Sequence, residues 1–256
     1  MFPKPTIAVE VGPSALRHLI TDDTFVAEQK YDGVRCIAIA SPFEAPILLN
    51  RRGKVMEAMH IQEARSILER NLRLLGRSVI LDGELLSTGE YVAFDLLSLD
   101  GVDTRPESLS KRRKLLEAVS LPEGITIPPQ ALTTTDKLIL LKQVKDECLE
   151  GIVFKDKTGP YVSWETRNFL KWKNIQTLDL VITARNTNGK TNAEVSFHGD
   201  EVPVAACTMI GKPDLPVGTV VEVAYLTVGQ SGRLSQPRIL RAREDKRPEE
   251  CIRTQI

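Results

Sequence analysis

Residues 28–35 of the chain read EQKYDGVR, and this stretch indicates both a local structure and a chemistry. Asp32-Gly33 lies between two runs of strand-forming residues, 25–30 and 34–40. Asp-Gly between such runs is a strong hairpin signal, because glycine tolerates positive φ. The pattern therefore predicts a β-hairpin that holds Lys30. This lysine is either a solvated strand-end residue or a reactive group. Motifs elsewhere in the sequence are needed to decide between these two interpretations.

Composition limits the class of protein without selecting a function. The chain has 256 residues, 42% hydrophobic and 27% charged, which is typical of one large globular domain or two unequal ones. Its 34 basic and 34 acidic residues give a net charge of zero, so bulk charge neither favours nor excludes a polyanionic partner. Local basic runs at 51–54, 111–114 and 233–247 can contact phosphates, although such runs are more often solvated faces.

Several classes of site and location are disfavoured. The four cysteines form no C-x-x-C pair, which argues against a zinc site or a disulfide framework and fits a reducing compartment. The three histidines are scattered without the spacing of metal ligands. The N-terminus lacks the apolar core of a signal peptide, and no segment is long and apolar enough to span a bilayer. We therefore expect a cytoplasmic protein with no membrane partner.

The first part of the chain mixes strands and helices. Residues 1–24 resemble a short leader. Strand-like runs follow at 78–81, 91–94, 152–154 and 169–173, and helical periodicity appears at 61–75, 109–119 and 136–148. This alternation predicts an α+β domain with two packed antiparallel sheets, over residues 1–174.

The pattern changes after Asn174. Five strand-like runs occupy 178–185, 193–197, 202–209, 219–228 and 239–243. Turn signals separate them at Asn188-Gly189, 198–200, 213–217 and 229–232. Five short strands in so few residues predict a small β-barrel of the OB-fold type over residues 175–256, which is a common nucleic-acid-binding platform.

Seven short stretches follow in order: EQKYDGVR (28–35), NRRGK (50–54), LDGELL (81–86), YVAFDLL (91–97), EGIVFK (150–155), NFLKWK (168–173) and RAREDK (241–246). In this order and spacing they resemble the motif set of the covalent nucleotidyltransferases, specifically ATP-dependent DNA ligases. The resemblance spans residues 28 to 247. It implies a nucleotidyltransferase (adenylation) domain followed by an OB-fold domain, and it favours a reactive Lys30.

By this resemblance Lys30 is the catalytic nucleophile, whose amine attacks the α-phosphorus of ATP. A free lysine has a pKa of about 10.4 and is almost wholly protonated at neutral pH. Neighbouring cations and a divalent metal disfavour the ammonium form and expose the lone pair. The resemblance implies that these cations are Mg²⁺ (or Mn²⁺ as a substitute), Arg35, Lys171 and Lys173. The two lysines alternate across Trp172, so they would project from one face of a strand.

The resemblance also assigns the residues that would hold the nucleoside and the metal. Glu28 matches the residue that reads the adenine amino group, and Phe94 matches the ring that stacks on the base, although an aromatic residue in a strand is normally part of the core. Glu84 matches the carboxylate that binds the ribose hydroxyls, and it joins Glu150 as a candidate Mg²⁺ ligand. The alternatives are a surface acid for Glu84 and a helix end followed by Gly151 for Glu150.

The remaining assignments concern phosphates. Arg35 and Arg51 match arginines that contact the nucleotide sugar or the phosphate at a nick, with Asn50 where serine or threonine is expected. Lys155, Lys171 and Lys173 match phosphate-contacting lysines, and Arg167 lies where the family often has an arginine. In the last motif, Arg243, Asp245 and Lys246 would orient the leaving pyrophosphate. That implies a barrel that covers the active site for the first step and then moves away to grip DNA; the alternative is a solvated basic tail.

Two features of the chain favour ATP and a minimal enzyme. Relatives that use NAD carry an extra N-terminal domain, and only 29 residues precede Lys30. We also see no room for a helical DNA-binding domain or for a long DNA-encircling insertion. We therefore expect a bacterial or viral ligase of core and barrel only, which acts as a monomer and binds DNA modestly and with steep salt dependence.

The sequence thus predicts a DNA ligase that seals 5′-phosphate/3′-hydroxyl nicks in double-stranded DNA through a lysyl-AMP intermediate. Three alternatives remain open at this point. They are an mRNA capping guanylyltransferase, an RNA ligase of the same superfamily, and a non-catalytic protein that binds nicks.

Overall fold

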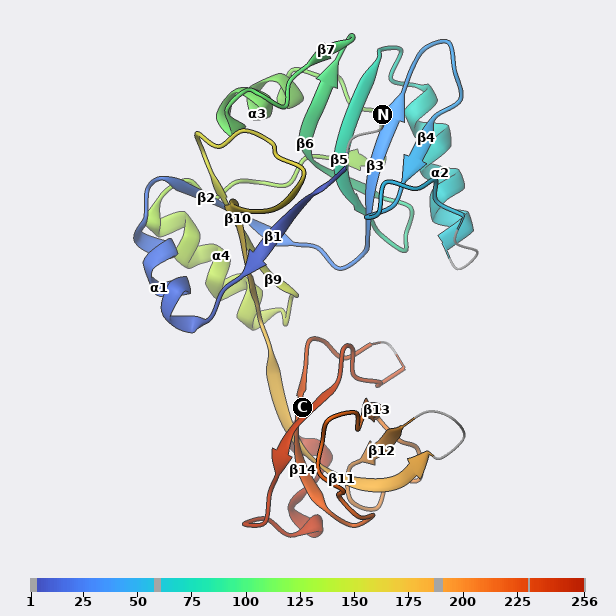
Figure 1. Ribbon diagram of the computed structural model, residues 1–256, viewed down its shortest axis with the longest axis vertical. Helices are drawn as coiled ribbons and strands as arrows, with labels where there is room; N and C mark the ends of the chain where they lie inside the picture. Colours follow the sequence, from blue (N-terminus) through green and yellow to red (C-terminus); the bar gives the residue numbers. More distant parts are fainter. Residues whose placement is uncertain (1–3, 58–60, 187–190, 230, 256) are drawn as a thin grey trace. The chain divides into compact units, whose positions relative to one another are not determined.

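The computed structural model describes residues 4–57, 61–186, 191–229 and 231–255. The chain divides into two compact units, Met1–Trp172 and Lys173–Ile256 (Figure 1). The helices and strands of the first unit are β1 (Thr6–Glu10), α1 (Pro13–Thr21), β2 (Phe25–Lys30), β3 (Val34–Ala40), β4 (Ile47–Leu49), α2 (Gln62–Arg73), β5 (Val79–Leu85), β6 (Tyr91–Leu99), β7 (Val102–Asp103), α3 (Leu109–Glu117), β8 (Ile125–Thr126), α4 (Thr134–Asp146), β9 (Gly151–Asp156) and β10 (Trp164–Lys173). Those of the second are β11 (Gln176–Asn186), β12 (Asn192–Ser196), β13 (Ala205–Thr208), β14 (Val220–Tyr225), β15 (Arg238–Ala242) and two short 3₁₀ helices, η2 (Pro248–Glu250) and η3 (Arg253–Gln255).

The first unit contains two sheets. Sheet A has the strand order β1-β10-β9-β2, and sheet B has the order β4-β3-β5-β6-β7 with β8 paired to β6. The predicted α+β architecture with antiparallel sheets is confirmed for the central ladders β2–β9, β3–β5 and β5–β6. Two pairs, β1–β10 and β6–β8, are parallel.

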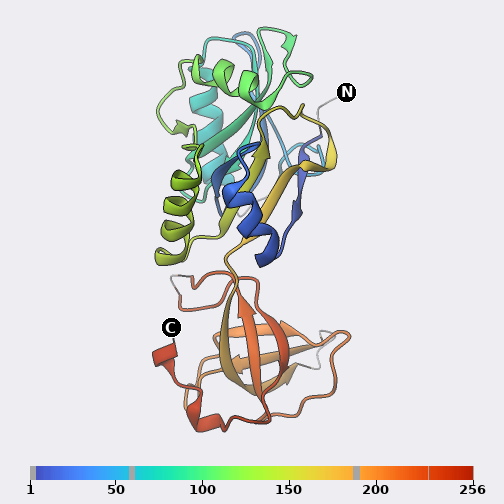
Figure 2. The same cartoon turned by 90° about the vertical axis from the view of Figure 1, so that its left-hand side faces the viewer.

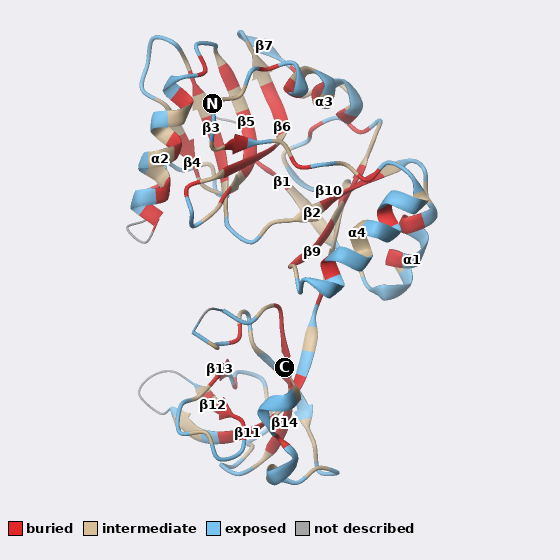
Figure 3. Cartoon of the chain, turned by 180° about the vertical axis from the view of Figure 1, so that it is seen from behind, coloured by how far each residue is buried: buried red, intermediate tan, exposed pale blue. Residues whose placement is uncertain are grey.

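Helices cover the outer side of each sheet with separate hydrophobic clusters. Helices α1 and α4 pack on β2 and β9 through residues such as Leu19, Val144 and Phe154, which are all buried. Helix α2 packs on sheet B through Leu68 and Leu72. Figure 3 shows these buried residues on the strands and on the inward sides of the helices. The helices therefore leave the facing sides of the two sheets for the site.

The segment KYDGVR is not a hairpin, so the prediction from Asp32-Gly33 is wrong. Strand β2 pairs with β9, whereas β3 pairs with β4 and β5, so the chain crosses from sheet A to sheet B between Lys30 and Val34. Gly33 is not among the glycines with positive φ. A Cβ at Gly33 would instead lie 2.6 Å from the carbonyl oxygen of Leu85 and 2.9 Å from Cγ of Glu84. Glycine is required here because the crossing segment touches β5.

Residues 4–24, which the sequence analysis describes as part of a short leader, form a strand and a helix of the first unit, and this is a second correction. Strand β1 extends sheet A by pairing with β10. Helix α1, with Pro13 in its first turn, buries Leu16, Leu19 and Ile20 in the core of the first unit. This segment belongs to the first unit because β1 pairs with β10, and because the apolar residues of α1 recur at helical spacing and pack in the core.

The second unit is one antiparallel sheet with the order β13-β12-β11-β14-β15. Its edge strands β13 and β15 approach each other, so the sheet curls around a core that includes Ile182, Phe197 and Val223 (Figure 2). All five predicted strands are present, with shorter bounds for 202–209 and 219–228. The turn predicted at Asn188-Gly189 lies outside the described residues, as does Gln230 within the turn predicted at 229–232.

The structure also bears on the helices and the cysteines of the chain. Among the described residues, no helix has the length and apolar character needed to cross a membrane. The four cysteines are free, as predicted, and Cys36, Cys207 and Cys251 are buried.

Candidate active site

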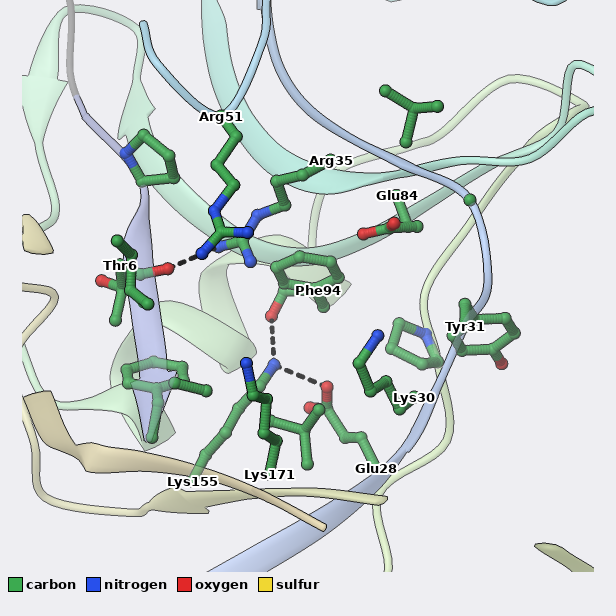
Figure 4. Close-up of a pocket in the computed structure, with 18 of the residues that line it drawn as sticks. Thr6, Glu28, Lys30, Tyr31, Arg35, Arg51, Glu84, Phe94, Lys155 and Lys171 are labelled. Atoms are coloured by element: carbon green, nitrogen blue, oxygen red, sulfur yellow. Dashed lines mark hydrogen bonds and ion pairs between the residues drawn. The ribbon is translucent and has the colours of Figure 1, made fainter. Parts of the chain in front are cut away.

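A pocket of about 560 Å³ lies between sheets A and B of the first unit (Figure 4). The predicted site residues that line it are Glu28, Lys30, Arg35, Arg51, Glu84, Phe94, Lys155 and Lys171. They come from strands β2, β3, β5, β6, β9 and β10 and from the turn after β4. Residues 5–8, at the start of β1, also line the pocket, and the sequence analysis did not assign them a role there.

Lys30 forms an ion pair at the end of β2. Its Nζ lies 2.6 Å from Oε2 of Glu150, and the Lys30 side chain is 23% exposed. The contact follows from the β2–β9 ladder, in which Lys30 lies opposite Gly151, the neighbour of Glu150. A cation that binds Glu150 would compete with Lys30 for this carboxylate.

Glu28 lies two residues before Lys30 on β2 and is almost fully buried. Its Oε2 lies 2.5 Å from Nζ of Lys155, and its Oε1 accepts a hydrogen bond of 2.8 Å from Nε2 of Gln130. Nη1 of Arg113 lies 3.7 Å from the same oxygen. Two hydrogen-bond donors, Lys155 and Gln130, thus fix the Glu28 carboxylate, and the more distant charge of Arg113 adds to the compensation that burial of a charge requires. Neither Gln130 nor Arg113 was predicted as a partner of Glu28: Arg113 was noted only as part of the basic run 111–114, and no local pattern marks Gln130.

Lys155 lies among the residues assigned to the base. Besides Glu28, its Nζ contacts the carbonyl oxygen of Phe94 at 3.2 Å and lies 4.7 Å from the centroid of the Phe94 ring. The guanidinium of Arg35 lies 4.6 Å from the same ring. Phe94 is only partly buried, so its ring faces the pocket between two cations. The phosphate role of Lys155 stays a prediction, since in this structure its ammonium pairs with Glu28.

Arg35 is held by a buried network that the sequence analysis missed. Its Nε and Nη2 donate to the two carboxylate oxygens of Asp82 at 2.6 and 2.5 Å. The hydroxyl of Tyr161 donates to Asp82 at 2.6 Å and accepts from the backbone N–H of Thr6 at 3.1 Å. Burial alone would lower the pKa of Arg35, but Asp82 raises it, so the guanidinium stays charged. Asp82 could have been suspected, because an acid inside an apolar strand needs a cationic partner.

Glu84 lies opposite Arg35 in the β3–β5 ladder and faces the pocket. Burial raises the pKa of Glu84 to about 7; Arg35 and Lys30 oppose the shift, and Glu150 and Asp82 add to it. Glu84 and Glu150 are therefore two carboxylates close enough to repel each other. No group of three or more metal-binding side chains occurs among the residues that the structure describes. Two carboxylates fit Mg²⁺, which usually takes one or two protein ligands and completes its shell with water and substrate phosphates.

The other predicted residues lie elsewhere. Lys173, Arg243, Asp245 and Lys246 belong to the second unit. There Arg243 pairs with Asp245 at 2.9 Å and with Asp179 at 3.0 Å, and Lys246 pairs with Asp179 at 2.8 Å. Arg243, Asp245, Lys246 and Asp179 therefore form an ordered ion cluster and not a loose basic tail. Arg167 is exposed on β10 of the first unit.

Comparison with known proteins identifies the relatives of this chain. Residues 86–173 match the family described as ATP dependent DNA ligase domain. The chain is 27% identical to the multifunctional non-homologous end joining protein LigD of Mycolicibacterium smegmatis, over 88% of this chain and 37% of that protein. It is 27% identical to a DNA ligase of Methanothrix thermoacetophila, over 73% of this chain and 39% of the relative. An mRNA-capping enzyme of African swine fever virus is 33% identical over 41% of this chain and 14% of that enzyme. The chain thus spans less than two fifths of the length of each of these relatives.

Solved structures share the fold. The ligase domain of M. tuberculosis LigD has a TM-score of 0.56 and 22% identity, with 98% of both chains covered. A Lig E DNA ligase has a TM-score of 0.68 and 17% identity, with 95% of this chain and 100% of the other covered. The fold is therefore that of the nucleotidyltransferases to which ATP-dependent DNA ligases belong. Residues 86–173 thus match an ATP-dependent DNA ligase domain, and the chain is homologous to LigD and to DNA ligases, in agreement with the resemblance of its seven motifs.

Proposed function

We propose that the chain is an enzyme that seals 5′-phosphate/3′-hydroxyl nicks in double-stranded DNA with ATP. The observation that carries this proposal is the pocket between sheets A and B. Lys30 lies there beside the Glu150 carboxylate. The pocket also brings together the Phe94 ring, which suits a nucleobase, the fixed Glu28 carboxylate, which suits the amino group of that base, and several cations, which suit phosphates. Homology to DNA ligases supports DNA as the substrate class.

In the proposed first step the neutral amine of Lys30 attacks the α-phosphorus of ATP. A nitrogen–phosphorus bond forms, the bond to the β-phosphate bridging oxygen breaks, and pyrophosphate leaves with that electron pair. AMP then passes from Lys30 to the 5′-phosphate at the nick, and the 3′-hydroxyl displaces AMP from this phosphate. Arg35, which Asp82 holds rigidly, and Lys171 would stabilise charge that develops on the phosphates.

The same scheme gives roles to the other pocket residues. Phe94 would stack on adenine, and Glu28 would accept a hydrogen bond from its amino group. Glu84 and Glu150 would hold Mg²⁺, which when bound neutralises phosphate charge. Binding of a cation at Glu150 would also weaken the Lys30–Glu150 ion pair and so release the Lys30 side chain toward the α-phosphate.

We propose further that residues 1–174 form the nucleotidyltransferase domain and residues 175–256 an OB-fold domain. The curled five-stranded sheet, in which β11 pairs with β12 and β14, supports the OB-fold assignment. Arg243, Asp245 and Lys246 would orient pyrophosphate in the first step, together with Lys173. The protein would act as a monomer in the cytoplasm of a bacterium or of a virus-infected cell.

A sealing assay with parallel substrates tests the proposal. We expect the wild-type protein to join nicked DNA with ATP and Mg²⁺, and Lys30→Ala to lose all joining. GTP in place of ATP should fail, because its base presents an acceptor and not an amino group at the position that Glu28 would contact. Labelling by GTP would favour a capping guanylyltransferase, and preferential joining of nicked RNA would favour an RNA ligase. Binding to nicks without joining, under conditions in which a known ligase is active, would favour a non-catalytic protein.

A further inference from the structure

Trp164 is held in an unusual backbone conformation at the start of β10. Its φ is +85°, which is an energetically costly outlier for a bulky side chain. The residue nevertheless stays 58% exposed, so burial of the ring in the core does not offset this cost. Strained residues of this kind cluster at sites that contact ligands.

The Lys4 side chain lies over the indole ring and extends to the basic turn after β4. Nζ of Lys4 lies 4.1 Å from the ring centroid, and the hydroxyl of Ser163 donates to the carbonyl oxygen of Lys4 at 3.1 Å. The side chain of Lys4 also lies 3.7 Å from the position of a Cβ on Gly53, so it reaches the turn after β4. We use the name Trp164 surface for the exposed residues that meet here, Lys4, Arg52, Lys54 and Trp164.

The Trp164 surface continues the wall of the candidate active site. Pro5 and Thr6, the next residues after Lys4, line the pocket, and so does Arg52. Trp164 pairs with Thr6 in the β1–β10 ladder, and its backbone N–H donates to the carbonyl oxygen of Pro5 at 3.4 Å. Figure 4 shows Thr6 and Arg51 on the same side of the pocket. A strand whose phosphate enters the pocket on this side would therefore pass the Trp164 surface.

The chemistry of this surface suits an unpaired nucleotide. The Lys4 ammonium lies over the ring, and the residue is 58% exposed, so part of the side chain is accessible to a ligand. A nucleobase can stack on an aromatic ring with little dependence on sequence, while neighbouring cations bind its phosphates. In the interior of a duplex, both faces of each base are covered by its neighbours. A base that stacks on Trp164 needs a free face, which an unpaired nucleotide beside a break provides.

We propose that the Trp164 surface binds an unpaired nucleotide of the DNA strand next to the reacting phosphate. Trp164 stacks on the base, and Lys4, Arg52 and Lys54 contact the flanking phosphates. The substrates of the enzyme would then include breaks with unpaired nucleotides beside the junction, in addition to fully paired nicks. The inference rests on the proposed function for the role of DNA, and it deepens that function by naming a class of substrate.

The test compares two single strands of equal length and charge, oligothymidylate and the same backbone with abasic tetrahydrofuran residues. We expect the wild-type protein to bind oligothymidylate about tenfold more tightly, in line with one stacked base. Trp164→Gly should bind the two strands equally, while Trp164→Phe should keep most of the difference. Glycine adopts positive φ without steric cost, so Trp164→Gly should unfold at the same or a higher temperature than the wild type.

Two further comparisons make the outcome specific. Phe43→Ala, which removes an aromatic residue that is 93% exposed elsewhere in the first unit, should keep the wild-type preference. A wild-type protein without preference for the strand with bases, or a Trp164→Gly protein that retains the preference, would overturn the proposal. Transfer of labelled AMP from ATP to the wild type and to Trp164→Gly reports on the proposed function separately, because Trp164 is not among the residues that line the pocket.

Discussion

Glu84 illustrates how the fold changes the chemistry of a single residue. Free glutamate has a pKa near 4.3, whereas burial and the nearby carboxylates of Glu150 and Asp82 raise the pKa of Glu84 to about 7. In the ligand-free protein this residue therefore binds a proton over a pH range in which the unfolded chain does not. The consequence is a stability that depends on pH.

We expect the Glu84 contribution to fall as the pH rises from about 4.5 to 7. In this window the folded state binds more protons than the unfolded state, so the free energy of unfolding decreases with pH, by up to about 3 kcal/mol in total. Glu84→Gln has no carboxylate at this position, so it does not lose this contribution as the pH rises. The free energy of unfolding of Glu84→Gln relative to the wild type should therefore be higher at pH 8 than at pH 5, in denaturant unfolding with a chelator present. A gain that is equal at both pH values would contradict the shift.

Gln130 gives a second test at the residue scale, because it fixes Glu28 from outside the pocket. A hydrogen bond to a charged group is worth about 1.5–3 kcal/mol, and its loss should let the carboxylate move. We expect Gln130→Ala to lower the preference for ATP over purine riboside triphosphate, which lacks the 6-amino group, by about tenfold in adenylation rate. Gln143→Ala, on the exposed side of α4, is the control. An unchanged preference in Gln130→Ala would show that this contact does not position Glu28.

The eight predicted residues that line the pocket could be found because each lies within one of the quoted motifs, where neighbouring positions in the sequence reveal the pattern. The pairing of these residues with their supporting partners could not be predicted. Asp82 and Arg35 are 47 positions apart, and Tyr161 and Asp82 are 79 apart. Gln130 and Glu28 are 102 positions apart. Contacts of this kind depend on which strands pair, and no local pattern encodes that.

At the scale of elements, the crossing between β2 and β3 shows the same limit. The alternation of residues correctly predicts strands on both sides of Asp32-Gly33. The error concerns their partners, since each strand pairs with strands from distant parts of the chain. The glycine is needed for a reason that the turn signal does not contain, namely contact with β5.

Gly33→Ala tests this account of the crossing. The added Cβ would lie 2.6 Å from a backbone oxygen of Leu85, so β3 or β5 must shift and displace Arg35 and Glu84. We expect a loss of stability of about 1–3 kcal/mol and at least a tenfold slower adenylation. Gly12→Ala, where a Cβ meets nothing within 4 Å, should cost less than about 1 kcal/mol. Wild-type behaviour of Gly33→Ala would contradict the requirement for close approach.

At the scale of the whole molecule, the two units are proposed to contribute to different parts of the reaction. The first unit contains the pocket, and the second contains the Arg243 cluster, which is proposed to act on pyrophosphate. If this division holds, damage to the cluster should affect only the step that releases pyrophosphate.

Arg243→Ala should therefore slow the formation of the enzyme adduct at least tenfold while leaving the sealing of a pre-adenylated nick largely intact. Arg253→Ala, which breaks the pair with Asp200 at 3.0 Å in the same unit, controls for general damage to the second unit. Equal losses in both steps for Arg243→Ala would contradict a role that is confined to pyrophosphate.

The central claim is that Lys30 takes up AMP from ATP. The most direct measurement is peptide mapping by mass spectrometry after incubation with ATP and Mg²⁺ and then with pyrophosphate. We predict one AMP on the peptide that contains Lys30, bound through an acid-labile linkage, absent in Lys30→Ala and removed by pyrophosphate with regeneration of ATP. AMP on another residue, or an adduct that persists in Lys30→Ala, would contradict the account.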